Sequence, residues 1–193
     1  AALTLTAALL FLTSAARPAS EPADVRISAM LDSARHCESS GKEEVAMAWY
    51  ARAERLAPEA ESDTLKGRLY AAVARLYDRV LLDASCAGPY YDALRSFLHG
   101  GDTAGFVRAR LESIGSLIIG NRPDEAACRL RELTRSLCGN SRFDSSVALM
   151  EARLALRSGA KERAGSLLKR ALAAGGGAAT DWLGVGENGL LWE

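Results

Sequence analysis

Apolar residues recur at helical spacing along most of the chain. The stretch EEVAMAWYARAERLAPEA (43–60) places Ala46, Tyr50 and Ala53 at steps of four and three before Pro58. These steps put the three residues on one face of an α-helix, which proline then ends because it disfavours helical geometry in the preceding residue. An upstream stripe with similar spacing, followed by a Ser-Ser-Gly turn, consists of Ile27, Met30, Leu31, Ala34 and Cys37. The first 60 residues therefore predict a helical hairpin.

The hairpin pattern recurs three more times, after shifts of 40, 40 and 38 residues. The shifted positions are Tyr70, Ala74, Tyr77, Tyr90 and Ala93, then Arg110, Ile114, Leu117, Leu130 and Leu133, then Ala148, Ala152, Ala155, Leu168 and Ala171. Only Arg110 breaks the apolar series. Turns are expected at 120–123 and 158–159, and Pro89 requires its helix to begin near Ala87. The pattern predicts an all-α fold of about four helix-turn-helix hairpins of 38 to 40 residues, stacked as an α-solenoid.

The order small, aromatic, small and then proline on the second helix resembles the tetratricopeptide repeat. Ala46, Tyr50, Ala53 and Pro58 fall at the spacing of that family, although Cys37 replaces an aromatic residue of the first helix. The period of 38 to 40 residues is also longer than the family's usual 34. The resemblance implies a right-handed superhelix whose first helices line a concave groove that holds a peptide or a partner helix.

The two ends of the chain differ from the repeats. Residues 1–22 begin AALTLTAALLFLTSAARPAS, which resembles the hydrophobic and cleavage regions of a secretory signal peptide, or else forms a short buried or interfacial helix. We expect export to the periplasm or cell envelope of a bacterium. Residues 23–174 would form the repeat domain. The Gly-rich tail, residues 175–193, would cap the array, begin a further segment or dock on a partner.

Arginines are over-represented on the predicted inner face of the superhelix. The first helices offer twenty inward positions, and seven of these are arginine, whereas arginine fills only 20 of the 193 places in the chain. The groove arginines are Arg35, Arg68, Arg75, Arg79, Arg108, Arg153 and Arg157. Guanidinium groups match carboxylates in a fork, so an acidic peptide is the natural ligand. Alternatively, these arginines pair with carboxylates on their own helices, such as Glu38 and Asp78.

An Ile pair interrupts the polar inner face. Ile118 and Ile119 would form a hydrophobic anchor for a ligand if they are exposed in the groove. If they are buried, they belong to the core beneath the next hairpin.

Composition and charge narrow the classes of function. The 24 basic and 24 acidic residues balance, so no global field favours a nucleic acid or a membrane surface. The four cysteines and two histidines lack zinc-ligand spacing, and we expect the cysteines to be small buried residues. No nucleophile, phosphate-loop or cofactor motif is present. We therefore expect neither an enzyme nor a metal or cofactor site.

The sequence favours a non-enzymatic protein interaction scaffold that binds a peptide segment, with acidic peptides as the first candidates. The alternative is the exported sensory repeat domain of a membrane-tethered bacterial transcriptional or signalling regulator, whose output domain would follow Glu193. In both cases membrane contact would come only through a leader or a missing segment. A third hypothesis is self-association through the tryptophan-containing tail.

Overall fold

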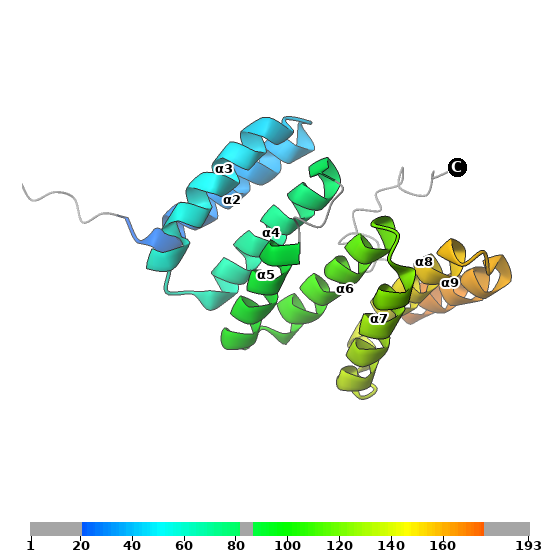
Figure 1. Ribbon diagram of the computed structural model, residues 1–193. Helices are drawn as coiled ribbons and strands as arrows, with labels where there is room; N and C mark the ends of the chain where they lie inside the picture. Colours follow the sequence, from blue (N-terminus) through cyan, green and yellow to red (C-terminus); the bar gives the residue numbers. More distant parts are fainter. Residues whose placement is uncertain (1–20, 82–86, 176–193) are drawn as a thin grey trace, which may run out of the picture. The chain divides into compact units, whose positions relative to one another are not determined.

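The chain is helical throughout the part that the structure describes. This computed structural model describes residues 21–81 and 87–175, and no strand occurs within these ranges (Figure 1). The α-helices of the described residues are α2 (Ala23–Ser39), α3 (Glu43–Leu56), α4 (Asp63–Leu81), α5 (Ala87–His99), α6 (Thr103–Ile119), α7 (Pro123–Leu137), α8 (Asp144–Arg157) and α9 (Lys161–Gly175). Within the described ranges, the short 3-10 helices η1 (Ala57–Glu59) and η3 (Ser141–Phe143) precede α4 and α8. The all-α prediction is confirmed, whereas most of the predicted leader and tail lies outside the described residues.

The helix ends fall where the turn residues predicted them. Helix α3 gives way to η1, in which Pro58 occupies the second position. Helix α5 begins at Ala87, so Pro89 lies in the first turn, and α7 begins directly at Pro123. Because the first-turn N–H groups of a helix have no intrahelical acceptor, proline costs no hydrogen bond there. Local backbone chemistry thus sets these boundaries.

The described residues form two compact units, and the division falls between Glu61 and Ser62. The first unit contains α2, α3 and η1. Ala34 and Ala46 are fully buried in this unit, and small side chains of this kind allow two helices to approach closely. The Tyr50 hydroxyl donates a hydrogen bond to Glu38 across the pair, and the backbone N–H of Glu61 donates to Asp24 at 3.0 Å. The first hairpin therefore has its own tertiary contacts.

The second unit contains α4 to α9. Consecutive helices pack against each other, and the first helices of successive hairpins also touch, α4 with α6 and α6 with α8. The positions that the repeat made equivalent to Ala34 and Ala46 are buried here as well, at Ala74, Ala126 and Ala164. The predicted hairpins are therefore present, whereas the right-handed superhelix over residues 23–174 stays a prediction.

One hydrophobic cluster of the second unit joins α6, α7 and α8. Its buried members are Val107, Leu111, Ile114, Ile118, Ala126, Leu130, Leu133, Val147 and Met150. Arg110, the break in the apolar series, lies at the edge of this region and pairs with Glu132 of α7 at 3.5 Å. The charged residue is thus accommodated at the surface, and the apolar stripe beside it remains continuous.

A ring packed between two glycines joins α4, α5 and α6. Phe97 is 4% exposed, and a β-carbon added to Gly67 would lie 2.7 Å from its Cδ1 atom. The same addition at Gly105 would lie 2.5 Å from that atom. Contacts this short are repulsive, so the two glycines leave the space that the ring fills. Sequence patterning singled out the tyrosines of the repeat and missed this residue.

The prediction that the cysteines are buried was wrong for two of them. Cys128 and Cys138 are exposed, Cys37 is half-buried, and Cys86 lies outside the described residues. The buried face of α7 carries Ala126 and Leu130, and Cys128 lies about 200° around the helix from Ala126, on the opposite side. Cys138 follows the last residue of α7 in a left-handed conformation, with φ of 46°. Helical phase thus explains the exposure of Cys128, and the position after the helix end explains that of Cys138.

Candidate functional site

Charged side chains of α4, α6 and α8 meet on one surface of the second unit. The central face, as we call this surface, consists of Arg75, Asp78, Arg108, Glu112, Ser116, Arg153 and Arg157. Arg75 Nη1 lies 2.9 Å from Glu112 Oε1, and Ser116 Oγ donates to Asp78 Oδ1 at 2.7 Å. Both contacts join α4 to α6.

The same kind of contact joins α6 to α8. Arg157 Nη2 donates to Asn121 Oδ1, just after α6, at 3.0 Å. A β-carbon added to Gly115 would lie 3.7 Å from Arg153 Nη1, so this guanidinium rests against the glycine. The hydrogen-bonded pairs of the central face are 36 to 38 residues apart in sequence. Such a constant offset arises when the first helices of successive hairpins run parallel, one repeat apart.

Glu112 is the most buried carboxylate of the central face. Its side chain is 7% exposed, Oε1 accepts from Arg75, and Oε2 has no hydrogen-bond partner within residues 21–81 and 87–175. Burial raises the pKa of Glu112, because removal from water penalises the charged form, while the positive charges of Arg75 and Arg108 oppose the rise. Asp78 adds to the rise through its negative charge. The Arg75–Glu112 ion pair thus buries a carboxylate, and the hydrogen bond from Arg75 only partly replaces the water that this carboxylate loses.

Glu112 is expected to make stability depend on pH. Its folded pKa lies above the ordinary value of 4.5, so the folded chain binds more protons than the unfolded chain above that pH. The stabilising effect of the proton is complete below about 4.5 and is lost as the pH rises through the raised pKa. We therefore expect the free energy of unfolding of the parent, relative to Glu112→Gln, to increase as the pH falls from about 7.

The measurement is urea unfolding of the two chains at several pH values, followed by circular dichroism. Taking the difference cancels the titrating groups that the chains share. A difference that stays constant, or that decreases toward acid, would contradict the raised pKa.

Arg153 is a half-buried cation of the central face that has no counter-charge among the described residues. Its side chain is half-buried, and among the described residues it forms no hydrogen bond or ion pair. Burial alone lowers the pKa of its guanidinium. Desolvating a charge is costly unless a group of opposite charge compensates it. A carboxylate bound at this position would supply that compensation.

The other predicted groove residues lie at different places. Arg35 belongs to the first unit and pairs with Asp32 of its own helix at 3.2 Å, as the alternative hypothesis expected. Arg68 and Arg79 are exposed on α4. The Ile pair is split, since Ile118 is 5% exposed in the core and Ile119 is 58% exposed. The anchor hypothesis is therefore wrong for Ile118 and remains open only for Ile119.

Sequence reasoning missed three polar residues of this region. The predicted groove residues do not include Glu112 or Ser116, and Asn121 lies in the turn expected at 120–123. Helical phase gave one signal, because Glu112 and Ser116 lie four and eight residues after Arg108 and so share its face. No local sequence pattern indicates that Glu112 and Ser116 contact Arg75 and Asp78 of the neighbouring helix.

Comparison of the chain with known proteins provides no precedent for the central face. The chain has no match among protein-family models, curated proteins or solved structures. Within residues 21–81 and 87–175, no helix combines the length and the apolar composition needed to cross a bilayer. The same ranges contain no group of three or more His, Cys, Asp or Glu residues that could hold a metal ion.

Proposed function

We propose that the protein is a non-enzymatic helical-repeat scaffold that binds an acidic peptide segment on the central face. The observation that carries the proposal is the half-buried guanidinium of Arg153, which has no counter-charge among the described residues. Because the chain already bears the desolvation cost of this cation, a ligand carboxylate gains the charge-assisted hydrogen bond at a reduced cost.

The charge of the surrounding residues supports the same ligand. The central face carries four arginines, Arg75, Arg108, Arg153 and Arg157, against the two carboxylates of Asp78 and Glu112. An acidic segment would therefore approach a surface with an excess of positive charge. Because that attraction is electrostatic, binding should weaken as salt is added.

The exposed side chain of Ile119 would give an apolar side chain of the ligand a contact on the protein. Ile119 is 58% exposed at the end of α6, two residues before the Asn121 that binds Arg157. The best ligand would therefore combine carboxylates with one large apolar residue near the end that meets Arg157. This pattern distinguishes a specific segment from a generic polyanion.

The test is fluorescence anisotropy with a labelled glutamate-rich peptide and with its glutamine counterpart. We expect the glutamate peptide to bind and the glutamine peptide not to bind. Arg153→Met should weaken binding of the glutamate peptide by about tenfold, which corresponds to the loss of one hydrogen bond to a charged group. Methionine keeps an unbranched apolar stem while it removes the guanidinium, so the charge and the contact of Nη1 with Gly115 are lost and the buried stem is largely replaced.

The matched control is Arg95→Met on α5, where the arginine is exposed and lies away from the central face. This variant should bind the glutamate peptide as the parent does. Equal binding of both peptides, or equal loss in the Arg95 and Arg153 variants, would remove the basis of the proposal.

A further inference from the structure

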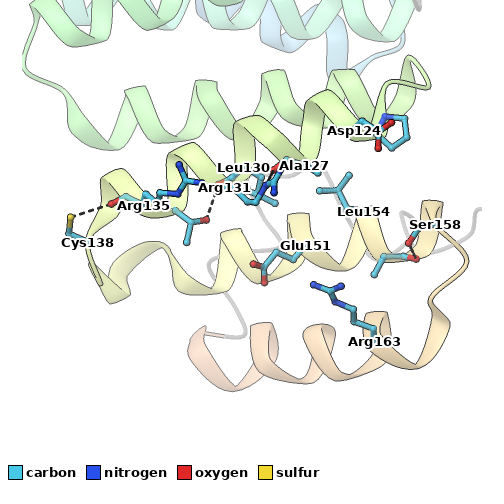
Figure 2. A pocket seen from close by; sticks show the side chains of 13 residues that line it. Asp124, Ala127, Leu130, Arg131, Arg135, Cys138, Glu151, Leu154, Ser158 and Arg163 are labelled. Atoms are coloured by element: carbon cyan, nitrogen blue, oxygen red, sulfur yellow. Dashed lines mark hydrogen bonds between the residues drawn. The ribbon is translucent and has the colours of Figure 1, made fainter.

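A second surface lies on the other side of α8. A groove of about 820 Å³ opens between α7 on one side and α8 with the beginning of α9 on the other (Figure 2). Its apolar lining comprises Ala127 and Leu130 of α7 and Leu154 and Ala155 of α8. The groove lies entirely within the second unit and shares none of its lining residues with the central face.

Arginines predominate among the charged residues of this groove. Arg131 and Arg135 come from α7 and Arg163 from α9, and none of the three forms an ion pair among the described residues. Glu151 also lines the groove, but its Oε2 accepts a hydrogen bond from Arg170 at 2.5 Å. Asp124 is the remaining carboxylate. The groove therefore presents an apolar centre with an excess of positive charge.

We propose that residues 176–193, the tail that follows α9, bind in this groove. The tail carries Asp181, Glu187 and Glu193 and no Lys, Arg or His. Its large apolar residues are Trp182, Leu183, Val185, Leu190, Leu191 and Trp192. Acidic and large apolar residues thus alternate along one short segment, and this combination complements the apolar centre and the arginines of the groove.

The position of α9 makes this docking geometrically accessible. Ser145 Oγ donates to the carbonyl of Ala171 at 2.8 Å, so the end of α9 lies beside the start of α8. The start of α8 follows Cys138, which lines the end of the groove, by a few residues. The tail therefore begins near the Cys138 end. Its 18 residues can extend about 60 Å, whereas the 15 residues of α7 span about 22 Å.

Cys128 of α7 and Cys138, which directly follows α7, provide a direct test in the chain of residues 1–193. Cys138 lines the groove and Cys128 does not, although both are exposed. We would measure the alkylation rate of each thiol by iodoacetamide labelling and mass spectrometry, in the parent and in the double variant Trp182→Ala/Trp192→Ala. The expected result is an increase of about fivefold at Cys138 and no change at Cys128, as for a site that is open one-fifth of the time.

Charge reversal in the groove provides a second, independent variant. Arg131→Glu/Arg163→Glu should increase the Cys138 rate in the same way, because it repels the acidic tail. Lys169→Glu, on the same helix as Arg163 but outside the groove, should leave the rate unchanged. These substitutions are on the surface, and circular dichroism would show that the helices are retained.

Three outcomes would overturn the proposal. Equal Cys138 rates in the parent and in both variants would mean that the tail does not cover the groove. Equal increases at Cys128 and Cys138 would mean that the variants loosen α7 itself. Protection of Cys138 that grows with protein concentration would assign the bound segment to a second copy.

Discussion

Replacing Phe97 with alanine is expected to lower the free energy of unfolding of the second unit by about 3–5 kcal/mol. The ring is 4% exposed and lies between Gly67 of α4 and Gly105 of α6, so its loss leaves a cavity that involves three helices. The measurement is urea denaturation followed by far-ultraviolet circular dichroism. Leu98→Ala, at the neighbouring position that is 67% exposed, is the control and should change the value by less than about 0.5 kcal/mol.

Substitution of Gly67 tests whether the packing of the Phe97 ring causes this loss of stability. In the parent chain, Gly67→Ala places a β-carbon 2.7 Å from the ring and should destabilise the unit by about 1–3 kcal/mol. In the Phe97→Ala chain the added methyl group enters the cavity, and alanine is also the better helix former by about 1 kcal/mol. The same substitution should then be stabilising. An equal cost in both chains would show that the clash is not with Phe97.

Replacing Arg75 with methionine is expected to cost about 1–3 kcal/mol at neutral pH. Its guanidinium donates a hydrogen bond to Glu112, whose other carboxylate oxygen has no partner in the part of the chain that the structure describes. The substitution therefore leaves a buried charge, which is more costly than a missing surface pair. The cost should shrink at acidic pH, because the neutral carboxyl group tolerates burial and burial already raises the pKa of Glu112.

Two further variants show whether the cost of losing Arg75 comes from the buried charge of Glu112. The double variant Arg75→Met/Glu112→Gln should recover most of the lost stability, since it removes both charges together. Arg68→Met, at an exposed position of the same helix, should have almost no effect. If the double variant is no more stable than Arg75→Met alone, the loss comes from packing of the arginine stem and not from Glu112.

The interaction between Arg75 and Glu112 also constrains tests of binding. Reversing the charge of Arg75 would place two carboxylates together and unfold the site before any ligand is considered. Arg153 has no such partner among the described residues, so its removal probes the ligand more directly.

The helices and their boundaries could be predicted from the sequence, because their causes are local. Proline fixes its own φ and restricts the residue before it, so Pro58, Pro89 and Pro123 mark the ends and starts of helices. Helical periodicity likewise identified Ala34, Ala74 and Ala164 as buried residues. The sequence by itself thus determined an all-α chain of hairpins and the core face of most helices.

Partners across helices were decided only by the tertiary structure. Whether Arg75 meets Glu112, or Arg153 meets no carboxylate, depends on which residue stands about 37 positions away on the next helix. A stripe of polar residues has the same sequence pattern whether it faces water, a neighbouring helix or a ligand. Phe97 was missed for a similar reason, since the space for its ring comes from glycines on two other helices. Periodicity fixes the face of a helix that a residue occupies, and only packing fixes what that face meets.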